Sequence, residues 1–121
     1  MTFGGKETLK GELENDNSKY IVAKIDDEVV GFAGIWKAVF DMHITNIVVR
    51  KDLRSLGIGK LLLERLIKMS KCEDVVSITL EVNSNNLPAI KLYEKFGFKN
   101  VGVRKNYYKN TDDAIIMTLN L

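Results

Sequence analysis

The chain has 121 residues, of which 45% are hydrophobic and 28% are charged. This length and composition predict one domain, 1–121, with a hydrophobic core, and they exclude a disordered or fibrous protein. The formal net charge of +2 excludes a broad positive field for nucleic acid, so any anion site must be local. A single cysteine excludes an internal disulfide, no apolar run approaches a membrane span, and we therefore expect a cytoplasmic protein.

The first half of the chain predicts a short helix followed by three strands. The pattern from Glu7 to Leu13 suits the helix, and the polar run 15–18 is turn chemistry that ends it. Strands are expected at 20–25 and 29–36, joined by Asp26-Asp27-Glu28 as a hairpin without the usual glycine. The residues 43–49 predict a third strand.

The next two elements differ in period. Residues 57–70 repeat as an amphipathic helix, and its predicted apolar stripe is Ile58, Leu61, Leu62, Leu66 and Met69. Residues 76–82 alternate as a strand, with Val76, Ile78, Leu80 and Val82 on the inner face. The other face carries Ser77, Thr79 and Glu81, so a carboxylate lies near the end of this strand.

A second helix is indicated by Asn85 and Asn86 as capping candidates, Pro88 in the first turn and Gly97 at the end. Its apolar stripe is Ala89, Leu92, Tyr93 and Phe96. Two more strands, 98–104 and 114–119, flank the polar turn 109–112. The order α-β-β-β-α-β-α-β-β predicts an α+β (α/β) fold with a mixed, mostly antiparallel sheet flanked by helices.

The loop Arg54-Ser55-Leu56-Gly57-Ile58-Gly59 carries the chemical signal. Amides at the start of a helix bind phosphate when glycines let the backbone approach, and Arg50, Lys51, Arg54 and Lys60 add local charge. A Walker loop would need four residues between its glycines and a Ser or Thr where Leu61 stands. The dinucleotide fingerprint would need a third glycine in place of Leu62.

This loop resembles the acetyl-CoA pyrophosphate loop of the GCN5-related N-acetyltransferase (GNAT) family, whose pattern is Arg/Gln-x-x-Gly-x-Gly/Ala. Three further segments match that family in order and spacing: Ile47-Val48-Val49, Asn86-Leu87-Pro88-Ala89, and Leu92 to Phe98. Within the family, the segments Tyr107-Tyr108 and Asp113-Ala114 resemble those of one bacterial group. The enzymes of that group acetylate the N-terminal alanine of a small-subunit ribosomal protein. The resemblance runs from about Phe3 to the end and lacks the usual first strand and helix.

The resemblance implies acetyl-CoA as co-substrate, with residues 54–60 (Arg54, Ser55, Leu56, Gly57, Ile58, Gly59 and Lys60) around the pyrophosphate. It further implies that the strand Ile47, Val48 and Val49 holds the thioester carbonyl by a backbone amide. Asn86 and the adjoining Ala89 would meet the pantetheine arm. Glu81 would be the general base and Tyr93, beside the sulfur, the general acid. The residues alone leave other roles open, since Glu81 could be a solvated carboxylate and Tyr93 a core aromatic.

The acceptor has a physical preference at neutral pH. An α-amine of pKa about 7.9 is partly neutral at pH 7, whereas a lysine of pKa about 10.4 is nearly all charged. We therefore expect the N-terminus of a protein, such as a ribosomal protein, and Tyr107-Tyr108 as a candidate clamp for its peptide. An acetyltransferase for a small amine or lysine, a non-catalytic acyl-CoA-binding module and a nucleic-acid-binding domain remain alternatives.

Three smaller expectations concern thiol chemistry, metals and assembly. A ping-pong route through Cys72 is disfavoured, because the sole histidine, His43, belongs to a different strand. One His and one Cys supply no spaced ligand set for a metal. A sheet that lacks its first strand exposes an edge, which a second copy could cover in a homodimer.

Overall fold

A mixed seven-stranded sheet organises the computed structural model, which describes residues 2–4, 17–108 and 112–121. The order across the sheet is β1-β2-β3-β4-β5-β7-β6, and every neighbouring pair is antiparallel except β4 and β5. This confirms the predicted mixed, mostly antiparallel architecture. The strands are β1 (Thr2–Gly4), β2 (Ser18–Ile25), β3 (Glu28–Ala38), β4 (Asp41–Val49), β5 (Ser77–Asn83), β6 (Lys99–Tyr108) and β7 (Asp112–Asn120).

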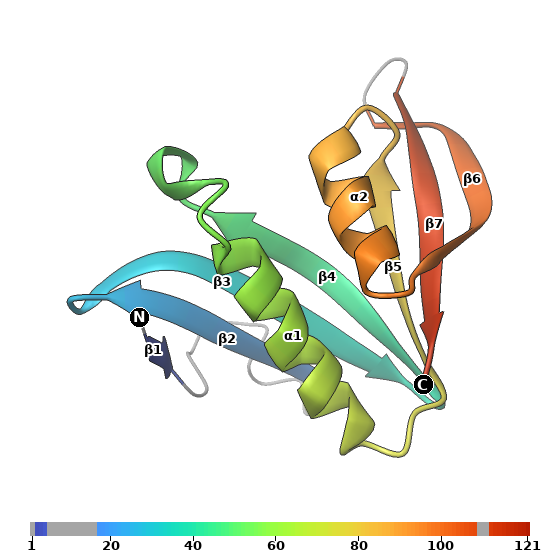
Figure 1. Cartoon of the computed structure of the whole chain (residues 1–121). Coiled ribbons are helices and arrows are strands. Elements are labelled where there is room, and N and C mark those ends of the chain that lie inside the picture. Colours follow the sequence, from blue (N-terminus) through green and yellow to red (C-terminus); the bar gives the residue numbers. More distant parts are fainter. Residues whose placement is uncertain (1, 5–16, 109–111) are drawn as a thin grey trace.

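Both α-helices, α1 (Ile58–Lys71) and α2 (Leu87–Lys95), lie on one face of the sheet. Helix α1 covers β2, β3 and β4, and α2 lies over β5 and β7 (Figure 1). The predicted stripe of α1 is confirmed at Ile58, Leu62 and Leu66 but is wrong at Leu61, which is 37% exposed. Leu63 and Ser70 are buried in its place, because the seating of α1 on the sheet rotates the buried stripe slightly.

The β2–β3 hairpin turns at Asp26 and Asp27, both of which have positive φ, 50° and 69°. Two left-handed residues in succession match the right-handed twist of paired strands, and aspartate adopts that conformation more readily than most residues. The predicted hairpin is therefore confirmed, with aspartates where asparagine and glycine are more usual.

The parallel neighbours β4 and β5 pair over only three positions. Asp41, Met42 and His43 lie opposite Ser77, Ile78 and Thr79, and beyond these positions the two strands diverge (Figure 1). The carboxyl-terminal part of β4 therefore has a neighbour on the β3 side and none on the β5 side within the described chain. The sheet opens as a wedge at this point, and α1 and α2 stand on either side of the opening.

Other expectations differ from the structure at the ends of elements. The strand β1 was not predicted, and it covers β2 from Val22 to Lys24, so part of the exposed edge that we expected is paired. Val76 precedes β5 and is 63% exposed, because the chain bends toward Phe40 there and is not yet in the strand. The predicted helix from Glu7 to Leu13 and the turn at 109–111 lie outside the described residues. No helix in the described segments is long and apolar enough to cross a membrane.

Candidate active site

The loop before α1 holds its backbone in an unusual conformation. Ser55 and Gly57 have φ of 68° and 87°, and a 3-10 turn, η1 (Lys51–Leu53), precedes them. Gly57 is the N-cap of α1 and offers no side chain to bond the first-turn amides. Arg54 and Ser55 lie within a hydrogen-bonded turn. Among the described residues, the amides of Gly57, Ile58, Gly59 and Lys60 donate no backbone hydrogen bond, and the first amide of α1 that does belongs to Leu61, which bonds Gly57 O at 3.1 Å. The loop thus presents unpartnered donors at the positive end of a helix.

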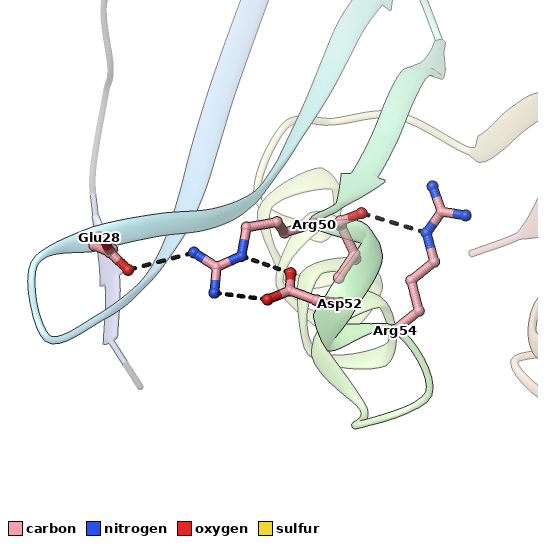
Figure 2. A network of polar contacts seen from close by, with 5 residues as sticks. Glu28, Arg50, Asp52 and Arg54 are labelled. Carbon is pink, nitrogen blue, oxygen red and sulfur yellow. Dashed lines mark hydrogen bonds and ion pairs between the residues drawn. The ribbon is translucent and has the colours of Figure 1, made fainter.

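The charges of this loop are divided between two sides, as Figure 2 shows. The Arg50 guanidinium bonds Asp52 through Nε at 2.7 Å and Glu28 through Nη1 at 3.3 Å, which raises the pKa of Arg50 and lowers that of Asp52. Our expectation that Arg50 adds positive charge for an anion is therefore wrong, because two carboxylates already compensate it. Arg54 points the other way and donates to Val49 O at 3.5 Å.

The open side of β4 carries backbone amides. The Arg50 amide bonds Val30 O at 2.7 Å, so it faces β3. Because successive residues of a strand direct their backbone groups to opposite sides, the amides of Val49 and Ile47 face away from β3, toward the side from which β5 has diverged. The Val48 amide faces β3, and its side chain is 42% exposed. A ligand in the wedge would meet donors from Ile47 and Val49.

On the other side of the wedge, Glu81 points away from the helices. Its neighbours Leu80 and Val82 are in the core, and alternation places Glu81 on the opposite face. Its Oε1 lies 3.4 Å from Arg104 Nε, whereas its Oε2 is buried with no hydrogen-bond partner. Asn46 of β4 also has a buried side-chain oxygen, Oδ1, without a partner. The sequence assigned no site role to Arg104 or Asn46.

Helix α2 contributes the remaining predicted side chains. Asn86 caps it by accepting the Ala89 amide at 3.3 Å, and Gly97, with φ of 96°, ends it; both predictions are confirmed. Tyr93 and Ala89 are partly buried against the core cluster, and the Tyr93 ring lies 5.8 Å from that of Phe98. Tyr93 therefore packs on the helix-bearing face, whereas Glu81 lies on the other face of β5.

Two aspartates at the start of β7 bond the neighbouring segments, Asp113 to β6 and Asp112 to the end of β5 and the loop after it. Asp113 Oδ1 accepts the Asn106 amide at 2.9 Å where β6 is irregular and Asn106 has φ of 54°, and this bond holds the pKa of Asp113 below its usual range. Asp112 accepts the side-chain amides of Asn83 and Asn85 at 3.1 and 3.0 Å. The backbone of Tyr107 and Tyr108 belongs to β6, but their side chains lie outside what the structure describes.

Cys72 and His43 belong to different parts of the molecule. Cys72 is exposed at the end of α1, whereas His43 Nε2 lies 3.0 Å from Asp41 Oδ2 and its ring centroid is 5.7 Å from that of Trp36. Asp41 also accepts the hydroxyl of Ser77. These contacts give His43 a partner at the narrow end of the β4–β5 pair, where the two strands still run together.

The loop, the wedge and α2 together match a known family. The sequence pattern described as Acetyltransferase (GNAT) family matches residues 3–98. The chain belongs to the GNAT family of acetyltransferases. It is accordingly an acetyl-CoA-dependent N-acetyltransferase, as the resemblance implied.

Two solved or curated relatives are bacterial enzymes of one kind. The chain is 37% identical over 110 residues to a ribosomal protein bS18-alanine N-acetyltransferase of Salmonella typhimurium (strain LT2), covering 87% of this chain and 74% of that protein. The crystal structure of the corresponding Escherichia coli enzyme superposes with a TM-score of 0.83 at 32% identity and covers 88% of this chain and 70% of that one.

A third relative was solved with the co-substrate. It is an acetyltransferase of Bacillus anthracis str. Ames in complex with acetyl coenzyme A, similar at 29% identity and a TM-score of 0.81, and it covers 90% of this chain and 65% of that one. Within the family, the chain is similar to ribosomal-protein alanine acetyltransferases.

Proposed function

We propose that the protein acetylates the N-terminal α-amine of a protein, of the kind that its bS18-alanine relatives modify, by direct transfer from acetyl-CoA. The observation that carries the proposal is the wedge between β4 and β5, because it brings an unpartnered phosphate-type loop, free strand amides and a carboxylate to one place.

The residues present suit acetyl-CoA. The amides of residues 54–60 and the side chains of Arg54 and Lys60 would bind the pyrophosphate. Among the described residues the amides of 57–60 donate no backbone hydrogen bond, and the carboxylates of Asp52 and Glu28 are engaged by Arg50. The pantetheine arm would continue the β4 edge, where the amides of Ile47 and Val49 point outward and Val48 and Ala89 flank the path. Asn86 keeps its side-chain nitrogen for the same arm, because only its oxygen caps α2.

The transfer forms a nitrogen–carbon bond and breaks the carbon–sulfur bond of the thioester. The ammonium form of the acceptor must lose two protons to become an amide. Glu81 accepts the first of these protons and passes it to water. The departing thiolate takes the hydroxyl proton of Tyr93, and the second proton of the amine then restores that hydroxyl. Glu81 and Tyr93 lie on opposite faces of the sheet beside the wedge, which lets the amine approach from one face and the thioester from the other.

The test uses the full chain with acetyl-CoA and a peptide that begins with alanine. We expect the release of one thiol for each peptide acetylated, mass spectrometry to locate the acetyl group on the α-amine, and acetyl-CoA alone to raise the melting temperature. Modification of lysine side chains only would contradict the proposed acceptor. Binding of acetyl-CoA with no thiol release on any amine would instead indicate a non-catalytic acyl-CoA-binding module.

Two related expectations remain proposals. The first is that the acceptor is a small amine, such as a polyamine, and not a protein N-terminus. Comparing kcat/KM on a polyamine and on the alanine peptide decides between these two acceptors. Among the described residues, β1 pairs with β2 only from Val22 to Lys24, so the rest of the β2 edge could pair with a strand of a second copy. Light scattering measures the mass in solution and tests this homodimer.

A further inference from the structure

Asn46 and Glu81 occupy equivalent levels on the two sides of the wedge. The last paired position is His43 opposite Thr79, and Glu81 follows two residues later on β5. On β4 the register against β3 shifts between Ile44 and Asn46, so Thr45 is an extra residue. Asn46 therefore takes the level, two positions beyond His43, that Thr45 would have in a regular strand. Asn46 is thus the residue of β4 nearest in level to Glu81.

Both side chains also face the same way. Asn46 lies opposite Gly34, whose neighbours Ala33 and Ile35 are in the core, so Gly34 and Asn46 face away from the helices. A side-chain atom added at Gly34 would meet Tyr20 and the Thr45 hydroxyl, which lie on that face. Glu81 faces away from the helices for the same reason, between Leu80 and Val82.

Each of the two side chains has an oxygen that lacks a hydrogen-bond donor. Asn46 Oδ1 and Glu81 Oε2 are buried acceptors, and neither has a hydrogen-bond partner. Leaving a buried acceptor without a donor is unfavourable, so such a group calls for a donor, which water or a bound ligand can supply. Each side chain is still partly open to solvent, Glu81 to 28%. Two acceptors facing one opening suit a ligand group that carries at least two N–H donors.

We infer that Asn46 positions the acceptor amine, by accepting one of its N–H groups at Oδ1 while Glu81 Oε2 takes the proton that the amine must lose. The inference rests on the proposed function and assigns a second side chain to its acceptor site. A neutral primary amine has two N–H groups and one lone pair. With one N–H on Asn46 and one toward Glu81, the lone pair is left to face the thioester carbonyl.

The geometry therefore predicts selectivity for primary over secondary amines. A secondary amine has one N–H in its neutral form, so it cannot satisfy both oxygens. We expect the wild type to prefer a peptide beginning with alanine over the same peptide beginning with N-methylalanine by about 10- to 100-fold in kcat/KM, the range of one hydrogen bond to a charged group.

The test compares that ratio between variants. Asn46→Leu keeps the volume and removes the acceptor, and should lower kcat/KM about tenfold on the alanine peptide while changing that on the N-methylalanine peptide less than threefold. Asn46→Asp keeps an oxygen in place and should keep the preference. Thr45→Val, in the same bulge, is the control and should behave as the wild type. The shift in melting temperature with acetyl-CoA shows that each variant folds, and Asn46→Ala replaces Asn46→Leu if the latter does not fold.

An equal loss on both peptides in Asn46→Leu, or an unchanged ratio, would overturn the inference. Failure of the proposed function looks different. If the wild type acetylates lysine and not the α-amine, the same comparison with lysine and N-methyllysine still measures the role of Asn46. If the wild type acetylates no amine of any class, both the proposed function and this role are refuted.

Discussion

Arg104 Nε lies 3.4 Å from Glu81 Oε1, although β7 separates the strands that carry the two residues. Glu81 of β5 and Gly102 of β6 both lie opposite Ile116 of β7, so Arg104 reaches across the middle strand from two residues further along β6. This contact engages one carboxylate oxygen and leaves the buried Oε2 without a hydrogen-bond partner. The β6–β7 hairpin therefore helps to orient the proposed base.

Replacing Arg104 tests that orientation. We expect Arg104→Ala to lower kcat/KM about tenfold, because Glu81 loses a fixed rotamer, while the melting temperature changes little. The side chain of Arg104 is 56% exposed, and exposed ion pairs contribute only about 0–1 kcal/mol. Arg104→Lys should recover part of the rate. Steady-state kinetics and a thermal melt on each variant check this, and a fully active Arg104→Ala enzyme would show that Glu81 needs no such partner.

Glu81→Gln removes the proposed base without changing its size. We expect kcat to fall by about 10²- to 10⁴-fold, the usual contribution of a general base, with acetyl-CoA binding unchanged. Glu64→Gln, an exposed position on α1, is the matched control and should keep the wild-type rate. A loss in Glu81→Gln that matches a weaker acetyl-CoA thermal shift would instead point to a folding or binding defect.

Tyr93→Phe isolates the hydroxyl of the proposed acid. The ring would remain against Phe98, 5.8 Å away, so its packing should be retained. We expect kcat to fall about 100-fold, since the thiolate must then leave without a proton. The check compares two thioester donors whose thiols differ in acidity. The donor with the more acidic thiol should show the smaller loss of kcat in Tyr93→Phe, because its thiolate leaves more easily without a proton. Equal losses for both donors would remove Tyr93 from proton transfer.

Gly57→Ala should weaken both the fold and the binding of acetyl-CoA. Gly57 has φ of 87°, where a residue with a side chain is strained by about 1–2 kcal/mol, although an added Cβ would meet no atom within 4 Å. The cost is therefore conformational and not steric. Gly57→Asn should be milder, because asparagine adopts left-handed conformations more readily. Thermal melts with and without acetyl-CoA measure both effects, and identical stability of the two variants would contradict the conformational explanation.

Asp113 makes part of the stability depend on acid pH. Its pKa is lowered from 3.8, first by the Asn106 amide and then by Lys105. A lowered folded-state pKa means that the carboxylate stabilises the fold above the unfolded value, and that this contribution is lost as pH falls through the lower folded-state pKa. We expect Asp113→Asn to be less stable than the wild type at pH 7 and to approach it as the pH falls from 3.8 through the lower folded-state pKa. A constant difference across this range would contradict the assignment.

Much of the fold followed from local patterns. The alternation in 76–82, the helical stripe around Leu62 and Leu66, and the Asn86 and Gly97 signals each predicted an element that the structure contains. Boundaries were less accurate, because Val76 has the side chain of a strand residue but lies in a bend. The short strand β1 carries no strong pattern of its own and forms by pairing with β2.

The sequence also predicted some features of the site and missed others. The residues 54–60 could be predicted as a phosphate-type loop, since glycine, helix start and charge all lie within one short segment. The compensation of Arg50 by Glu28 could not, because Glu28 is 22 residues away and meets Arg50 only through the pairing of β3 with β4. Asn46 gave no signal at all, since one asparagine in a strand has no periodicity to reveal it.

The elements from β2 to β7 and the anion loop can thus be read from the chain alone, because each depends on residues within about one turn or one strand of each other. Glu81 and Tyr93 became candidates through the resemblance to the GNAT family. The wedge between β4 and β5, the bulge that brings Asn46 level with Glu81, and the reach of Arg104 across β7 were decided by tertiary structure. Strand register sets which distant side chains meet, and a shift of one residue would turn every one of them to the other face.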